Sequence, residues 1–291
     1  MTLTLRYLCQ GDAKGRFLVA ILFLACLLSQ IGSALAQTLP PSLQTDFETG
    51  VAAIKAGRLD ESERAFLRVL REGGKVSFVY NNLGIVYQMQ GDQKRAIAQF
   101  REAIRLQPNY AAPRILLGAS LLAMGQDAEA TRELERAVKI QPDEPLAHVQ
   151  LAHAYKRTGN YAGLVEQYRA LHSLQPDDPE FLYQLGHAYS DQAEWCLIEI
   201  GKIDRNSVRL YETLGESYHR EGHLDLAVVA YKRAALVDPK QPGIHLALAQ
   251  ICLQQGRVTE ARKEINEELA IVPESVAAQA LAKRIASEAA K

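Results

Sequence analysis

One stretch of 34 residues decides the fold of this chain: SFVYNNLGIVYQMQGDQKRAIAQFREAIRLQPNY, residues 77–110. Its first half carries large and small apolar residues at spacings of 3, 1 and 3, which place them on one face of a helix. Gly91 ends this helix, because a glycine readily takes the left-handed conformation that closes a last turn. The residues of the shared face are Tyr80, Leu83, Gly84 and Tyr87.

The second half of the stretch predicts another helix that packs against the first. Ala96, Phe100 and Ala103 recur at spacings of 4 and 3 and form its apolar face, and Pro108 ends the unit. Counting from Ser77, the eighth position is Gly84. A residue this small lets the second helix approach closely, and the large residues at positions seven, eleven and 24 fill the remaining space.

The same pattern returns along the chain. Near-complete copies start at residues 111, 145, 208 and 242, and each keeps a small residue at position eight and a turn glycine at position fifteen. No single unit can bury its apolar face alone, so neighbouring units must stack. The residues at position eight in these copies are Gly118, Ala152, Gly215 and Ala249.

This pattern resembles the tetratricopeptide repeat family, whose unit is a 34-residue helix–turn–helix with an L-G-x2-Y…A-x3-F…P signature. The resemblance implies an all-α fold, a right-handed α-solenoid of stacked helix–turn–helix repeats with a C-terminal capping helix. It also implies the following organisation: a divergent first repeat at 43–76, three repeats at 77–178, two more at 208–275, and the capping helix at 276–291, with Val276, Ala280, Leu281 and Ile285 as its apolar face.

The unit at residues 179–207 departs from the pattern, because the next unit begins 29 residues later instead of 34. Its end, IDRNS, aligns with LQPNY, so the missing residues belong to the turn between the helices. We therefore predict one long helix from about Pro179 to Ile200 and a change of direction of the superhelix there. The alternative is a tightened turn near residues 190–192 that keeps both helices.

The first 36 residues read as an export signal. Basic residues precede the apolar run FLVAILFLACLL at 17–28, and Ala34 and Ala36 form an A-x-A-like cleavage site. We expect cleavage before Gln37, a linker at 37–42, and a secreted, periplasmic chain that does not insert into the membrane after cleavage. The alternatives are an uncleaved membrane anchor and a lipoprotein modified at Cys26.

Composition and motifs argue against several functions. The chain has 33 basic and 34 acidic residues, a net charge of −1, which disfavours nucleic-acid binding. It has no phosphate-binding glycine loop and no G-x-S-x-G or H-E-x-x-H motif, so we expect neither an enzyme nor a cofactor. His219 and His223 are four residues apart, but Gly222 interrupts the helix between them, so we expect no metal site. Cys196 and Cys252 lie in different units and should be free thiols.

The resemblance implies that the first helix of each repeat lines a concave groove through positions two, five, nine, twelve and thirteen. In the N-terminal units these positions are largely apolar, and in the middle of the chain they are polar and ionisable. We expect the two stretches to hold different parts of a bound peptide. The predicted groove residues are Phe47, Phe78, Asn81, Ile85, Met89 and Ile115 in the first stretch, and His153, Lys156, Arg157, Tyr183, His187, Glu212, Glu216, His219 and Arg220 in the second.

One subgroup of the family binds C-terminal carboxylates of chaperones through a Lys/Asn clamp, which this chain does not match. Asn81 and Ile85 stand where that clamp needs Lys and Asn, and Leu116 stands where the next unit needs Asn. The leading hypothesis is a non-enzymatic scaffold that binds a protein segment or peptide in the groove. The alternative is a structural module of an envelope complex that self-associates or tethers through its convex face and ends.

Overall fold

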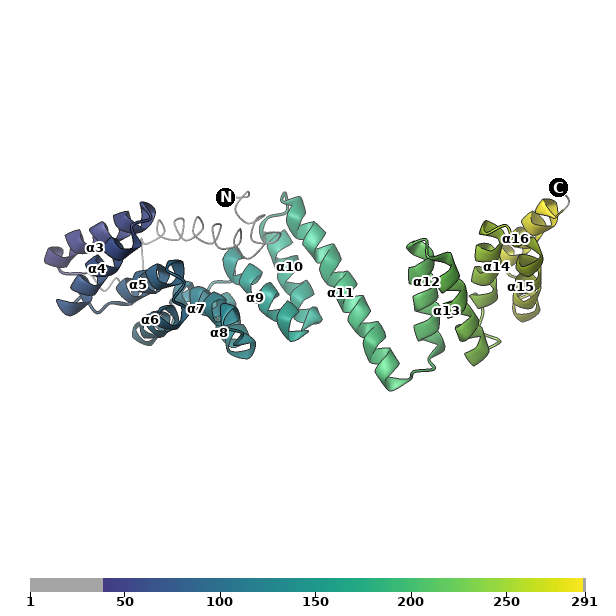
Figure 1. The fold of residues 1–291 in the computed structure, drawn as a ribbon, viewed down its shortest axis with the longest axis horizontal. Coiled ribbons are helices and arrows are strands. Elements are labelled where there is room, and N and C mark those ends of the chain that lie inside the picture. The colour runs from purple at the N-terminus through teal and green to yellow at the C-terminus, as the bar shows by residue number, and fades with distance from the viewer. Residues whose placement is uncertain (1–38, 290–291) are drawn as a thin grey trace. The chain divides into compact units, whose positions relative to one another are not determined.

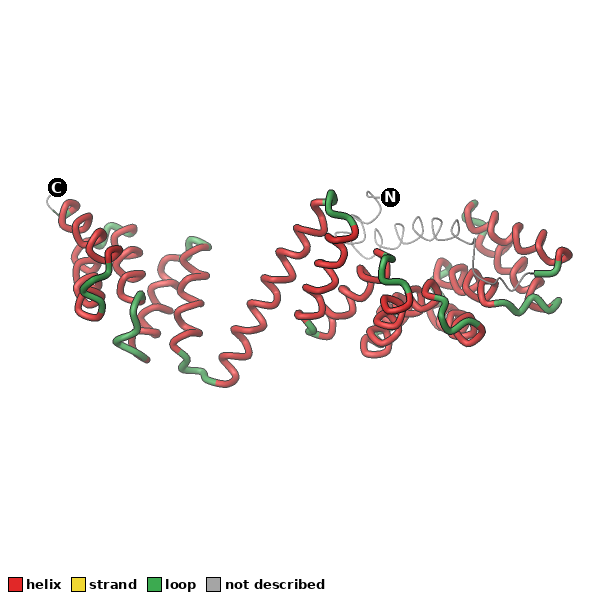
Figure 2. Tube along the Cα trace, turned by 180° about the vertical axis from the view of Figure 1, so that it is seen from behind, coloured by secondary structure: helices red, strands yellow, loops and turns green. Residues whose placement is uncertain are grey.

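The computed structural model of the chain describes residues 39–289, which form fourteen helices and no strand. Short loops join these helices (Figure 2). The helices are α3 (Pro41–Lys55), α4 (Leu59–Arg71), α5 (Ser77–Met89), α6 (Gln93–Leu106), α7 (Ala111–Ala123), α8 (Asp127–Ile140), α9 (Pro145–Thr158), α10 (Tyr161–Leu174), α11 (Pro179–Ile203), α12 (Val208–Arg220), α13 (Leu224–Val237), α14 (Ile244–Gln254), α15 (Val258–Ile271) and α16 (Val276–Glu288).

The chain divides into two compact units, and the boundary falls inside α11, between Gln192 and Ala193. The first unit has one continuous apolar core that runs from Leu43 to Ala188. The second unit has two smaller cores, one built mainly from α13 and α14 and one from α14, α15 and α16. Each unit is thus an all-α stack in which neighbouring helices share a core, as the repeat pattern predicts.

Where position eight is a glycine in a full-length repeat, at Gly50, Gly84, Gly118 and Gly215, it lies directly under the large residue at position 24. A Cβ atom on Gly84 would lie 2.6 Å from Cε1 of Phe100, and a Cβ on Gly215 would lie 2.8 Å from Cδ2 of Tyr231. Real side chains do not approach so closely, so these glycines are required by the packing of the two helices. Figure 1 shows the resulting helix pairs, such as α5 with α6.

The turn between the two helices of a repeat follows the sequence prediction. Gly91 has a φ of +82°, in the left-handed region, and closes α5. Asp92 then caps α6, because its carboxylate accepts a hydrogen bond from the backbone N–H of Arg95 at 3.0 Å. The turn of this repeat therefore contains a left-handed glycine that ends the first helix and an acidic residue that caps the start of the second.

Position four joins consecutive repeats, a role that its place on the apolar face does not reveal. The guanidinium of Arg114 donates to the carbonyl oxygen of Pro108 at 2.9 Å and pairs with Glu133. In the next repeat the imidazole of His148 lies 2.8 Å from the carbonyl oxygen of Pro142. Each of these buried side chains satisfies a carbonyl at the end of the preceding repeat, so it ties two repeats together.

The shortened unit forms one helix. α11 continues without interruption from Pro179 to Ile203, and no turn occurs at residues 190–192 (Figure 1). Asp178 caps its start by accepting from the backbone N–H of Glu180 at 3.0 Å. Ser207 caps α12 in the same way through Leu210. The change of direction predicted at this point concerns the placement of the two units and stays a prediction.

Two details of the predicted boundaries are wrong. Residues 41–42, assigned to a linker, form the first turn of α3, since a proline fits that turn without losing a hydrogen bond. In α16, Val276 is 79% exposed and Ala280 is also exposed. The buried face is instead Ala278, Leu281 and Ile285, because these residues are the ones that meet α14 and α15.

The predicted signal peptide, its cleavage site and the alternatives of an anchor or a lipidated Cys26 lie outside the described residues. Within residues 39–289, no helix has both the length and the apolar character needed to cross a bilayer.

The close helix contact in the third repeat gives a direct test of the packing. A Cβ atom on Gly118 would collide with the side chain of Leu134. Gly118→Leu should therefore destabilise the chain by about 1–3 kcal/mol or more, because the second helix must move away. Thermal melting followed by circular dichroism measures the effect. The exposed substitution Ala123→Leu in the same helix is the control, and equal melting of both variants would contradict the packing described here.

Candidate functional site

The N-terminal part of the candidate surface is built from aromatic and aliphatic side chains on α3 and α5. The ring of Phe47 lies 5.1 Å from that of Phe78 in an edge-to-face arrangement, and 5.6 Å from that of Phe66. Phe47, Phe78 and Met89 are half-buried and pack on the core of the first unit. Their remaining exposed area gives this region an apolar surface.

Three predicted groove residues do not lie on the surface. Asn81 is 5% exposed, and Ile85 and Ile115 are each 1% exposed. The expectation that these side chains are free to touch a ligand is wrong, because α5 and α7 contact each other and Ile85 and Ile115 belong to the apolar core of the first unit. A hydrogen bond of 3.1 Å from Gln88 of α5 to Ser120 of α7 spans this contact. The sequence pattern gave no signal for that bond.

Asn81, unlike Ile85 and Ile115, has a polar side chain. Its amide oxygen Oδ1 is buried and has no hydrogen-bond partner among the described residues. A buried acceptor without a donor costs about 1–3 kcal/mol. The Oδ1 atom of the adjacent Asn82 is buried and unpaired in the same way. Asn81 lies on the same helix as Phe78 and Met89. This oxygen is enclosed by protein, so it lies beneath the apolar surface and is not accessible to a ligand there.

The basic residues predicted on α9 form ion pairs within the first unit. Lys156 Nζ lies 2.8 Å from a carboxylate oxygen of Asp191. Arg157 lies 2.9 Å from Asp127 and also donates to the carbonyl oxygen of Leu122 at 3.0 Å. Both basic side chains remain largely exposed, so the pairs are screened by water and contribute little stability. Their positive charge is locally balanced by the two acidic partners.

Burial keeps the hydroxyl of Tyr155, which lies on α9 beside Lys156, protonated. The hydroxyl of Tyr155 donates to Glu135 at 2.9 Å. Burial, followed by this hydrogen bond, raises the pKa of Tyr155 to about 12. Tyr155 therefore remains a neutral donor at physiological pH. His153, also predicted in the groove, is half-buried.

The two predicted residues on α11 are exposed and touch each other. The rings of Tyr183 and His187 are 4.4 Å apart and nearly perpendicular, and Tyr183 is 56% exposed. They are one helical turn apart, so they form a small aromatic step on the surface of the first unit.

The second unit carries the remaining predicted residues on α12. Glu212 pairs with Arg209 at 3.0 Å, and the Nε2 atom of His219 lies 3.3 Å from the amide oxygen of Gln254 on α14. Burial, then the charges of Glu216 and Glu212, raise the pKa of Tyr231 to about 12. The surface of α12 is thus acidic near Tyr231, while Arg220 adds an exposed basic residue.

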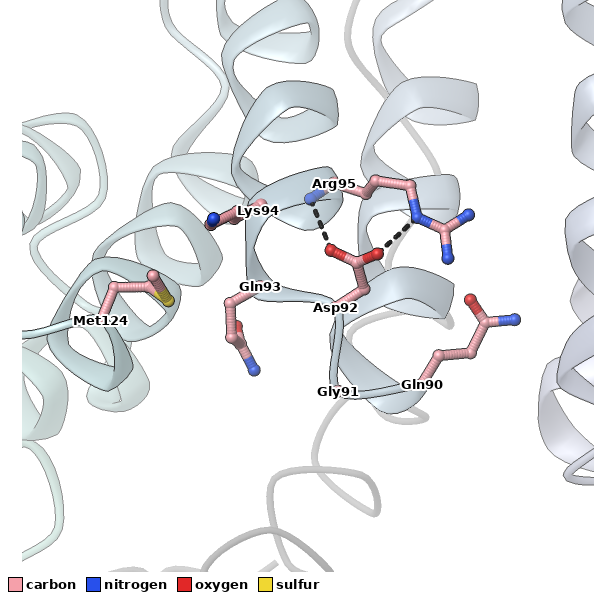
Figure 3. A pocket seen from close by; sticks show the side chains of 7 residues that line it. All are labelled: Gln90, Gly91, Asp92, Gln93, Lys94, Arg95 and Met124. Carbon is pink, nitrogen blue, oxygen red and sulfur yellow. Dashed lines mark hydrogen bonds and ion pairs between the residues drawn. The ribbon is translucent and has the colours of Figure 1, made fainter.

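The thiols and the side chains that could ligate a metal lie dispersed along the described part of the chain. In residues 39–289, no three His, Cys, Asp or Glu side chains gather where they could hold a metal ion. Cys196 is exposed, Cys252 is buried, and both are free thiols. Figure 3 shows a hollow at the α5–α6 turn, where Asp92 bonds to the backbone and guanidinium of Arg95. The carboxylate of Asp92 in this hollow is therefore already engaged in capping α6.

Three family models described as tetratricopeptide repeat match the chain. One matches residues 87–154 and 218–285, a second matches 145–188, and a third matches 47–111. The chain belongs to the tetratricopeptide repeat family. Repeats of this family generally mediate protein–protein interactions and are typically non-enzymatic.

Among curated proteins, a similar relative is the cellulose synthase operon protein C of Xanthomonas axonopodis pv. citri (strain 306). It is 43% identical over 67 residues, which is 23% of this chain and 4% of that protein. The chain thus spans only a small fraction of this relative's length.

Solved structures with similar folds include MamA, with 21% identity, 66% of this chain and 95% of that chain covered, and a TM-score of 0.42. YrrB, described as a TPR protein with an unusual peptide-binding site, shows 16% identity, coverage of 75% and 98%, and a TM-score of 0.40. A tetratricopeptide repeat protein from Parabacteroides merdae shows 14% identity, coverage of 85% and 100%, and a TM-score of 0.47.

Two exposed candidates test whether the predicted residues are surface or core. His187→Ala and Glu216→Ala should leave the melting temperature nearly unchanged, because both side chains are exposed. Circular dichroism melts of the two single variants check this expectation. A large drop in melting temperature would show that these residues support the fold instead of facing a ligand.

Proposed function

We propose that the chain is a non-enzymatic scaffold that binds an extended or helical segment of a partner protein on the first helices of its first unit. The observation that carries this proposal is the apolar surface of α3 and α5, where Phe47, Phe78 and Met89 keep part of their side chains exposed above the core of the first unit. The apolar side chains of the segment cover the exposed parts of the aromatic pair Phe47–Phe78.

The polar residues further along the first unit select the partner in this proposal. Tyr183 and His187 offer an exposed aromatic step, and Lys156 carries a charge that is only locally balanced by Asp191. Side chains exposed in this way contribute specificity more than affinity, because water screens them. The residues of α12, including Glu212, Glu216, His219 and Arg220, form a separate polar surface on the second unit.

The proposed location is the periplasm of a bacterial envelope. Support comes from the charged, apolar and small-residue sections of residues 1–36, which have the order of a secretory signal. The relative from Xanthomonas matches only 67 residues, so its name adds a bacterial context and no partner.

Substitution of Met89 tests the binding surface. Met89→Glu places a charge in the apolar contact and leaves the aromatic pair in place, and a charge buried without a partner is costly. Peptides selected from a random phage-displayed library on the full chain should bind this variant at least about tenfold more weakly, which corresponds to about 1.4 kcal/mol. Fluorescence anisotropy with the selected peptides measures the affinities.

The matched control is Val229→Glu, which places the same charge at an exposed apolar position of α13 in the second unit. This control should bind the selected peptides as the unsubstituted chain does. If no peptide is enriched, or if Met89→Glu and Val229→Glu bind equally well, the proposed surface is not a peptide-binding site.

The proposed location has its own test. When the full gene product is expressed in a bacterium, the chain recovered from the periplasmic fraction should begin at Gln37 by N-terminal sequencing. Ala36→Arg should block this processing, because a signal peptidase requires a small residue there. Recovery of an unprocessed chain in the cytoplasm would refute the proposed export.

A further inference from the structure

α11 has an apolar face that its own repeat leaves uncovered. Leu182, Gly186 and Tyr189 occupy positions four, eight and eleven, which in other repeats pack against a second helix. Here Leu182 is 55% and Tyr189 is 42% exposed. A Cβ atom on Gly186 would meet nothing within 4 Å, whereas the corresponding Gly84 lies under Phe100. The space above Gly186, which a second-helix side chain fills in other repeats, is therefore empty in the single chain.

The residue at position four of α11 indicates that this face of the helix contacts another apolar surface. The other six first helices carry a polar or charged residue there: Asp46, Tyr80, Arg114, His148, Tyr211 and His245. Among the first helices within residues 39–289, only α11 has an aliphatic side chain, Leu182, at this position. An exposed leucine at the start of an open apolar face is typical of an interaction surface.

The sequence pattern of the missing second helix is present in the chain. Ala193, Leu197 and Ile200 align with positions 20, 24 and 27, which in the second repeat are Ala96, Phe100 and Ala103. Because five turn residues are missing, this segment continues α11 and does not fold back. Leu182, Gly186, Tyr189, Ala193, Leu197 and Ile200 follow one another at helical spacings and so form one stripe along α11.

We propose that α11 pairs antiparallel with α11 of a second copy, and that Leu197 of the second copy fills the space above Gly186. The pairing is reciprocal, because the two-fold axis relates each Gly186–Leu197 contact to the other. That contact places the axis between Asp191 and Gln192. Each copy thereby supplies the second helix that the other one lacks, which is an exchange of the kind that a shortened turn promotes.

The charges of α11 are compatible with this contact. Helical spacing places Glu180, Asp191, Glu194, Glu199 and Lys202 outside the stripe. Pairing two stripes therefore buries no unpaired charge of α11, which would be costly. Arg169 of α10 meets the stripe, because its guanidinium donates to the hydroxyl of Tyr189 at 2.9 Å, but it is paired with Glu166. Tyr183 and His187 also lie outside the stripe, so the pairing does not depend on the proposed peptide-binding surface.

The association state of the full chain tests the proposal. Analytical ultracentrifugation should show a dimer. Gly186→Leu should give a monomer with unchanged helix content, because the space above Gly186 accepts a side chain in the single copy but is then closed to Leu197 of the second copy. Leu197→Asp should also give a monomer. The control Ile198→Asp, a substitution of an exposed residue outside the stripe on α11, should keep the dimer.

Crosslinking tests the antiparallel register. With Cys196→Ser as the background, chains carrying Tyr183→Cys and chains carrying Gly201→Cys are mixed and joined with a short bis-maleimide. Antiparallel pairing about the axis brings these two positions together in unlike chains, whereas like positions are then about 25 Å apart along the helix. A parallel pair would favour crosslinks between like chains and would overturn the register. A monomeric unsubstituted chain, or a dimer that survives both Gly186→Leu and Leu197→Asp, would overturn the proposal.

Discussion

The close contact between a small residue at position eight and a large residue at position 24 is the constraint on which the repeat structure depends. Where Gly84 meets Phe100 or Gly215 meets Tyr231, no added Cβ atom fits. The glycine removes the side chain that would separate the two helices, and the large residue fills the resulting space. Dispersion and burial at this point hold each helix pair together, so the pair can present its outer faces to the neighbouring repeats.

The sequence predicted the helix pairs well because this constraint leaves a regular trace of residue types. It also favoured the single helix α11, since five turn residues and the turn glycine are missing, and the alternative of a tightened turn near residues 190–192 is wrong. The position-four ties of Arg114 and His148 escaped prediction. Both residues lie at an apolar spacing, and only the structure shows that their polar atoms reach the carbonyls of the preceding repeat.

The candidate surface was harder to predict than the fold. Position numbers assign Asn81, Ile85 and Phe78 to the same groove, but only Phe78 of these three retains substantial exposed area. The exposure of a groove position depends on how closely two consecutive first helices approach, and a single-sequence pattern contains no measure of that distance. The charged positions, such as Glu216 and His187, were easier to place because ionisable side chains seldom lie fully buried without a partner.

The ties at position four have a consequence for how the chain unfolds. In a linear stack, the resistance of each repeat to opening depends on its own stability and on its coupling to its neighbours. Arg114 and His148 add a buried polar bond to that coupling at two successive joints of the first unit. Opening either joint would leave a buried donor and a carbonyl unsatisfied at once. The helices from α6 to α10 should therefore exchange their amide protons as one cooperative block, whereas the joint before α11 carries Leu182 in the tie position and opens with less resistance.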